Sequence, residues 1–150
     1  MWRSILKDNF HNISKLLDYL ELSPENREKV LTKSSFVLNV PKRLAQKIKK
    51  NDITDPLFLQ FVPLKEEQVL GFSKDPLKEI EFQETEKLLS KYPSRSLIIT
   101  TSACAMNCRF CFRRNFPYET ERKDFNNELD LLRNDSNIKE VILSGGDPLA

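Results

Sequence analysis

Two short apolar stretches constrain the fold of this chain more than any other feature. Residues 96–101 read "SLIITT", and residues 140–143 lie within "EVILSGGDPL". Both are short and rich in β-branched residues, as is typical of buried strands. Residues 125–133 between them have helical spacing, with Phe125, Leu129 and Leu132 expected on the inner face. A strand, a helix and a strand in this order predict a βαβ unit with parallel strands.

The residues before this unit have a different pattern. Apolar residues recur at spacings of three and four over residues 2–20, which predicts one amphipathic helix. Further short helices are expected to begin after Ser23, Val40 and Asp55. Each of these residues is followed by a proline, which is favoured at the first position of a helix. The sequence therefore predicts an α/β chain in two regions, a mainly helical region over residues 1–94 and a strand-helix-strand region over residues 95–150.

The charge balance excludes several classes of function. The 150 residues include 24 Lys and Arg and 22 Asp and Glu, so the formal net charge is +2. Interspersed charges of both signs do not favour a nucleic-acid or membrane partner. No apolar stretch is long enough to cross a bilayer, and the N-terminus does not resemble a signal peptide. We expect a cytoplasmic protein, where an odd number of cysteines argues against a disulfide framework.

The three cysteines of the chain, Cys104, Cys108 and Cys111, fall within eight residues directly after the first expected strand. Their spacing is C-x3-C-x2-C. Thiolates select zinc, copper(I) or iron–sulfur clusters, and a structural zinc site normally has four protein ligands. No fourth cysteine exists and the one histidine, His11, is remote in sequence. Three thiolates suit an iron–sulfur cluster with one open iron, whereas flanking arginines argue against cysteines that only pack in a core.

At these residues the chain resembles the radical S-adenosylmethionine enzymes. The resemblance implies that the three thiolates hold a [4Fe-4S] cluster whose open iron binds S-adenosylmethionine, and that residues 95–150 begin a partial (β/α) barrel. It also implies that Phe110 packs near the adenine. The motif "SGGDP" matches the family's glycine motif, which implies contacts to S-adenosylmethionine from Ser144, Gly145, Gly146 and Asp147. Because glycine permits close approach of backbone to ligand, a larger residue at Gly146 is expected to weaken binding and leave iron content unchanged.

Residues 71–119 narrow the resemblance to the lysine 2,3-aminomutases. "DPLKE", "KYPSR" and "CRFCFRR" occur there in that order, and "FCFRRNFPY" is most similar to the enzymes that make β-lysine for modification of elongation factor P. The resemblance implies conversion of L-lysine to β-lysine with pyridoxal 5'-phosphate as a further cofactor. By position, Lys91 and Arg95 match residues that hold its phosphate, although arginine is more usual in place of Lys91. Arg113 matches the arginine that pairs with the substrate carboxylate, a role suited to a planar guanidinium.

The length of the chain departs from the family pattern. A complete barrel takes roughly 250 residues, so we expect these residues to form only the N-terminal part of such an enzyme, as a truncated reading frame, half of a split gene or a fragment. The lysine that carries pyridoxal phosphate has no match here, so little uptake of that cofactor and no turnover are expected of this chain alone. A non-catalytic zinc or iron–sulfur module, an inactive remnant and a homo-oligomer stay open as alternatives.

Overall fold

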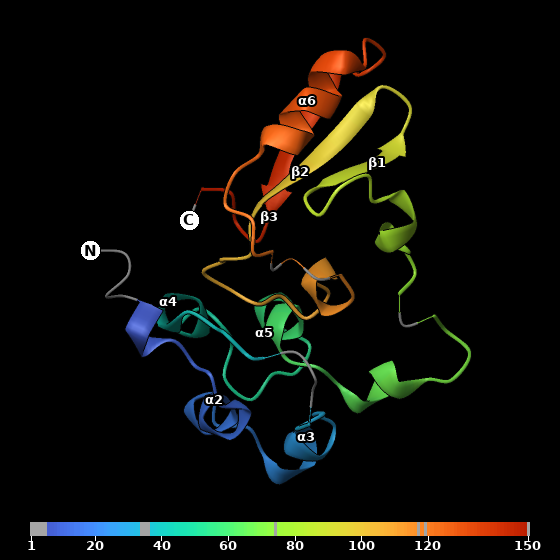
Figure 1. Ribbon diagram of the computed structural model, residues 1–150. Coiled ribbons are helices and arrows are strands. Elements are labelled where there is room, and N and C mark those ends of the chain that lie inside the picture. The colour runs from blue at the N-terminus through green and yellow to red at the C-terminus, as the bar shows by residue number, and fades with distance from the viewer. Residues whose placement is uncertain (1–5, 34–36, 74, 117, 119, 150) are drawn as a thin grey trace. The chain divides into compact units, whose positions relative to one another are not determined.

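The computed structural model describes residues 6–33, 37–73, 75–116, 118 and 120–149. The chain forms two compact units (Figure 1). The helical unit comprises residues of Met1–Phe72 and Ala105–Arg114, and the sheet unit comprises residues of Ser73–Cys104 and Asn115–Ala150. The cysteine-bearing loop is therefore shared, because Cys104 belongs to the sheet unit and most of the following loop to the helical unit.

The helical unit is built from short elements. They are η1 (Leu6–Asp8), α2 (Ile13–Tyr19), α3 (Pro24–Glu28), α4 (Lys42–Ala45), α5 (Pro56–Phe61), η2 (Lys65–Gln68) and η4 (Phe112–Arg114), where η marks a 3-10 helix. Two of the predicted helix starts are confirmed by side-chain caps, since Ser23 accepts a hydrogen bond from Asn26 N and Asp55 accepts from Leu57 N. No described helix has the length and apolar character required to span a bilayer.

The prediction of one helix over residues 2–20 is wrong for the described part of that range, and Trp2 lies outside the described residues. The chain forms η1 and then α2, separated by a backbone pairing in which Phe10 N donates to Val40 O at 2.8 Å. The side chain of Asn12 then accepts a hydrogen bond from a backbone N–H in the first turn of α2. The cap and the pairing outweigh a continuous helical periodicity, because both satisfy backbone groups that a helix end leaves open.

The sheet unit contains β1 (Leu88–Tyr92), β2 (Arg95–Thr101), α6 (Asn126–Asn134) and β3 (Glu140–Gly145), preceded by η3 (Glu79–Phe82). Figure 1 shows β2 as the middle strand of the sheet, and the strand order is β1-β2-β3. β2 and β3 are parallel, in register from Arg95 opposite Glu140 to Ile99 opposite Ser144, and the register shifts before Thr101, which lies opposite Gly145. The predicted βαβ unit and the α/β fold class are thus confirmed.

β1 lies in the region that the sequence predicted to be mainly helical. It pairs antiparallel with β2, and the two strands are joined by a tight turn in which Ser94 has a φ of 61°. The Oγ atoms of Ser90 and Ser96 lie 2.9 Å apart across the pair. A five-residue stretch with two leucines fits a helix or a strand equally well by periodicity. Pairing with β2 in a hairpin decides between them.

Of the three side chains expected on the inner face, Phe125 and Leu132 are half-buried, and the most buried residue of α6 is one that was not expected. Leu129 is 40% exposed, whereas Glu128 is fully buried. The Oε1 atom of Glu128 accepts a hydrogen bond of 2.5 Å from the hydroxyl of Thr85 and lies 3.7 Å from a guanidinium nitrogen of Arg122. Hydrogen bonding to a hydroxyl and a nearby cation allow a carboxylate to occupy the inner face of a helix.

Candidate functional site

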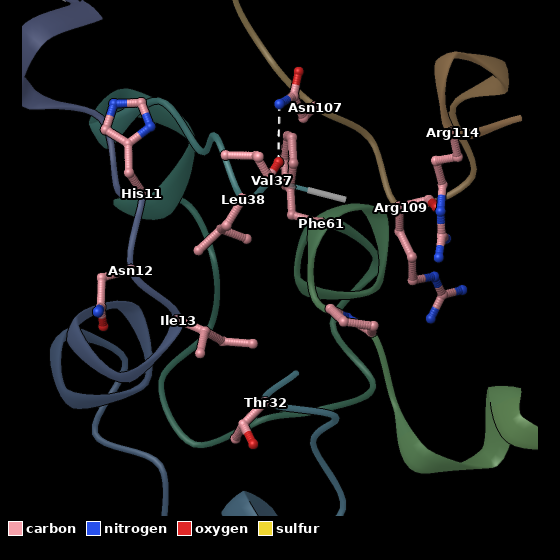
Figure 2. A pocket seen from close by; sticks show the side chains of 11 residues that line it. His11, Asn12, Ile13, Thr32, Val37, Leu38, Phe61, Asn107, Arg109 and Arg114 are labelled. Carbon is pink, nitrogen blue, oxygen red and sulfur yellow. Dashed lines mark hydrogen bonds between the residues drawn. The ribbon is translucent and has the colours of Figure 1, made fainter. Parts of the chain in front are cut away.

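The middle of the cysteine loop is held by backbone and side-chain hydrogen bonds within the helical unit. Asn107 N donates to Asn39 O at 3.2 Å, and Arg109 N donates to the carbonyl oxygen of Gln60 at 2.7 Å. The Asn107 side chain donates to Val37 O at 2.8 Å, which Figure 2 shows as a dashed line. Asn39 also donates from its side chain to Ala105 O at 3.2 Å. The helical unit therefore shapes this part of the loop.

Two of the three thiols accept hydrogen bonds within the helical unit. Gln60 Nε2 donates to Cys108 Sγ at 3.3 Å, and Arg113 Nε donates to Cys111 Sγ at 3.2 Å. Cys104, Cys108 and Cys111 are all free and half-buried. Partial exposure leaves room for a bound group, and hydrogen bonds to sulfur ligands are a regular feature of iron–sulfur sites.

The donor set therefore fits a cluster held by thiolates, with N–H groups directed at two of the sulfurs. Cys104 belongs to the other unit, so its sulfur is described only within the sheet unit. Within the described ranges, no group of three or more His, Cys, Asp or Glu side chains is arranged to hold a metal ion. Joint ligation by the three cysteines stays a prediction.

Two other predicted residues of the loop have contrasting surroundings. Phe110, expected beside an adenine, is 67% exposed. Besides its bond to Cys111, the guanidinium of Arg113 donates to Met106 O and to Asn107 Oδ1, each at 2.9 Å. Arg113 thus supports the loop. To pair with a substrate carboxylate, its guanidinium would have to bind the carboxylate in addition to these loop contacts or in place of one of them.

The glycine turn packs directly against the strand end that precedes Cys104. Gly146 N donates to Thr101 O at 2.7 Å, and Asp147 N donates to Ala103 O at 2.7 Å. A Cβ atom on Gly146 would lie 2.0 Å from Ala103 O. Glycine is therefore required here by close approach to protein backbone, which is a different reason from the approach to ligand that the sequence suggested.

Two more features belong to this turn. Gly145 has a φ of 135°, which an L side chain rarely adopts, and its own Cβ would lie 2.3 Å from Thr101 O. Ser144 O accepts a hydrogen bond from the Thr100 hydroxyl at 2.8 Å. The ends of the parallel strands β2 and β3 are therefore locked together immediately before Cys104. Contacts of this turn to S-adenosylmethionine stay a prediction.

Lys91 and Arg95 line one hollow of about 130 Å³, together with Phe82 and Glu79. Lys91 Nζ donates to Leu77 O at 3.1 Å and lies 4.9 Å from the centre of the Phe82 ring. Arg95 forms an ion pair with Glu140. Burial and the nearby Asp75 raise the pKa of Glu79, and Lys91 opposes that shift.

This hollow is at the start of β2, whereas Cys104 follows the end of the same strand. Seven extended residues span about 20 Å. Within the sheet unit, Lys91 and Arg95 therefore lie at the opposite end of β2 from Cys104.

A larger hollow of about 280 Å³ lies in the helical unit, bordered by His11, Thr32, Asn107, Arg109 and Arg114 among others (Figure 2). Arg109 forms an ion pair with Glu67 at 3.2 Å, and Arg114 donates to the carbonyl oxygen of Arg109. These cations are therefore engaged with protein groups.

Sequence reasoning assigned no role to Asn39 or Gln60. No local pattern marks either residue, because each acts through a contact with the distant cysteine loop. In the sequence alone, both are indistinguishable from ordinary surface amides.

The chain is 40% identical over 154 aligned positions to the L-lysine 2,3-aminomutase of Haemophilus influenzae, an alignment that covers 99% of this chain and 46% of that relative. It is 36% identical over 157 positions to the L-lysine 2,3-aminomutase of Escherichia coli, covering 99% of this chain and 45% of that relative. The chain is therefore similar to lysine 2,3-aminomutases over almost its whole length. The L-lysine 2,3-aminomutase of Clostridium subterminale is 31% identical, with 99% of this chain and 37% of the relative covered.

No family model matches the sequence. The chain spans less than half the length of each of these three curated relatives. The alignments nevertheless extend over almost all of this chain, so they include the helical unit as well as the cysteine loop. The relationship therefore reaches beyond the motif residues that carry the resemblance in the sequence.

Proposed function

We propose that this chain forms part of a radical S-adenosylmethionine enzyme that converts L-lysine to β-lysine. The observation that carries the proposal is a C-x3-C-x2-C loop with N–H donors directed at two of its sulfurs, at 3.3 and 3.2 Å. Relatives named L-lysine 2,3-aminomutase at 36–40% identity support the reaction and the small-molecule substrate. The three thiols would be the protein ligands of one [4Fe-4S] cluster.

When bound, such a cluster supplies the electron that cleaves S-adenosylmethionine. The residues of this chain would ligate the cluster, orient S-adenosylmethionine and shield both of them. The locked ends of β2 and β3 set the start of the cysteine loop, while Gln60 and Arg113 donate to its sulfurs. The turn containing Ser144, Gly145, Gly146 and Asp147 would lie beside the methionine end of the nucleoside, and Phe110 beside its adenine. The β2–α6–β3 unit would begin the (β/α) barrel.

We assign pyridoxal 5'-phosphate to the hollow that contains Lys91 and Arg95. Two cations in one cavity favour a phosphate group. Glu79 in the same hollow opposes an anion when ionised, and burial favours its neutral form. Arg113 would pair with the substrate carboxylate.

The cellular setting is also a proposal. The sequence "FCFRRNFPY" supports a role of β-lysine in modifying elongation factor P. Three free thiols that must stay reduced to ligate iron favour the cytoplasm.

The deciding experiment is anaerobic reconstitution of the chain with iron and sulfide, using wild type and Cys104→Ala, Cys108→Ala and Cys111→Ala variants. We expect about four irons per wild-type chain, broad absorption, and loss of both in each variant, because two thiolates are too few to hold the cluster. Ser136→Ala, which leaves every thiol in place, should bind iron as the wild type does. A Cys108→Ala protein with full iron and sulfide would contradict the assignment, and a colourless wild type with one zinc would favour a zinc module.

A further inference from the structure

Gln60 makes two contacts to the cysteine loop from α5. Its side-chain Nε2 lies 3.3 Å from Cys108 Sγ, and its carbonyl oxygen accepts a hydrogen bond of 2.7 Å from Arg109 N. One contact is made by the side chain of Gln60 and the other by its backbone. The main-chain contact fixes the loop beside the helix, and this leaves the side-chain amide directed at the sulfur.

The position of Gln60 on α5 is strongly determined. The carboxylate of Asp55 caps the helix by accepting from Leu57 N at 2.8 Å and from Phe58 N at 3.0 Å. Phe58 and Phe61, on either side of Gln60 in sequence, are 0% and 2% exposed. Rotation of α5 about its axis would expose one of these rings to water, which is unfavourable for a buried apolar side chain. The core of the helical unit therefore directs the Gln60 amide towards the loop.

We propose that Gln60 is a positioning residue that raises the reduction potential of the bound cluster through its N–H···S hydrogen bond to Cys108. The inference rests on the proposed function, because it requires the cluster to be present. Reduction adds negative charge to the cluster and its sulfur ligands, and a hydrogen-bond donor stabilises that charge. Hydrogen bonds to sulfur are one of the factors that set iron–sulfur potentials.

The neighbouring donor, Arg113, has a mixed role. Its guanidinium binds Cys111 Sγ, a backbone carbonyl and the Asn107 side chain at the same time. Replacing Arg113 would therefore disturb the shape of the loop as well as the sulfur. Gln60 separates the two effects, since a side-chain substitution keeps the carbonyl contact to Arg109.

The test uses the whole chain with its reconstituted cluster and a mediated redox titration followed by electron paramagnetic resonance. Gln60→Met removes the donor and keeps an unbranched side chain of similar length. Gln60→Glu keeps the shape but replaces the amide donor with an acceptor that is anionic near neutral pH. The control is Gln46→Met, at an exposed glutamine that ends α4.

We expect Gln60→Met to lower the midpoint potential, so that the ratio of reduced to oxidised cluster at the wild-type midpoint falls about tenfold, which corresponds to 59 mV for one electron. Gln60→Glu should lower it further, and Gln46→Met should not change it. Unchanged midpoints in both Gln60 variants, with full iron content, would overturn the inference and leave the proposed function intact. A wild-type chain that builds no cluster would overturn both. If Gln60→Met fails to fold, the isosteric Gln60→Glu variant decides, and an unchanged or higher midpoint in it contradicts the role.

Discussion

The two units bury their apolar residues to different extents. The helical unit has a continuous core that includes Leu16, Leu20, Val40 and Phe58, all fully buried, although its α-helices have only four to seven residues. The sheet unit has the more regular backbone pairing, yet Val141, Ile142 and Leu143 of β3 are 40%, 37% and 62% exposed. Regular secondary structure and a closed core are therefore separate properties in this chain. Burial in a closed core determines how much a substitution lowers the free energy of unfolding.

The largest effect is expected from truncating a core residue of the helical unit. Phe58→Ala should reduce the free energy of unfolding by about 3–5 kcal/mol, because it removes a fully buried ring and leaves a cavity. Leu143→Ala in the sheet unit should change it by less than about 0.5 kcal/mol. Urea unfolding followed by circular dichroism measures both. Equal losses for the two variants would show that the exposed strand is covered in solution.

The next effect concerns the glycine turn, which is tightly packed within the sheet unit. Gly146→Ala should destabilise by about 1–3 kcal/mol, since its Cβ would overlap Ala103 O. It should also lower the iron content after reconstitution, because the displaced backbone leads into Cys104. Gly71→Ala is the control for iron content: no atom lies within 4 Å of its added Cβ, so its φ of 99° should cost stability through backbone strain while the iron content stays at the wild-type level. Iron content that stays at the wild-type level in Gly146→Ala would support the ligand-facing explanation instead.

Loss of the hydrogen bond to the buried Glu128 carboxylate should have a comparable or smaller effect on the free energy of unfolding. Thr85 donates to Glu128 Oε1 and accepts hydrogen bonds from Lys87 N and Leu88 N. Thr85→Val keeps the shape but leaves the buried carboxylate without its hydroxyl donor, which should cost about 1–3 kcal/mol. The double variant Thr85→Val, Glu128→Gln tests the reason, because removing the negative charge should recover part of the loss. No recovery would show that the two backbone bonds to Thr85 dominate.

The smallest effect is expected on the surface of the helical unit. Hydrogen bonds from the hydroxyl and backbone N–H of Thr54, with help from Lys49, lower the pKa of Asp52 to about 2 from an ordinary 3.8. A lowered carboxyl pKa stabilises the fold fully above the unfolded value, and this contribution is lost as pH falls from 3.8 towards 2. Asp52→Asn should therefore unfold with a shallower pH dependence in that interval, measured by fluorescence at fixed urea. An unchanged slope would show that the hydrogen bonds to Asp52 are not kept in solution.

Local signals in the sequence predicted what local chemistry determines. Ser23 and Asp55 cap helices where a following proline indicated a start, and the β-branched stretch around Ile98 forms the strand expected of it. The cysteine spacing likewise indicated a ligand-binding loop, because the spacing of the thiols is a property of the sequence alone.

Contacts between elements explain what the sequence did not predict. Glu128 is buried because the hydroxyl of Thr85, 43 residues earlier, donates to it, and β1 is a strand because it pairs with β2 in a hairpin. Gln60 contacts a sulfur 48 residues further along. Periodicity and spacing describe single elements, so contacts of this kind are visible only when the elements are placed together.

The cysteine loop belongs in part to a unit whose other residues come much earlier in the sequence, and this affects folding during translation. Met106 and Cys108 pack against the core of the helical unit, yet they follow most of the residues of that core by more than 40 positions. At translation rates of about 5–20 residues per second, the earlier part of this unit leaves the ribosome seconds before the segment that completes it. During that interval Asn39 and Gln60 have only water as partners for the groups that later hold the loop. Limited proteolysis of stalled nascent chains ending before Ala105 or well beyond Arg114 should reveal this as weaker protection of α5 in the shorter chain.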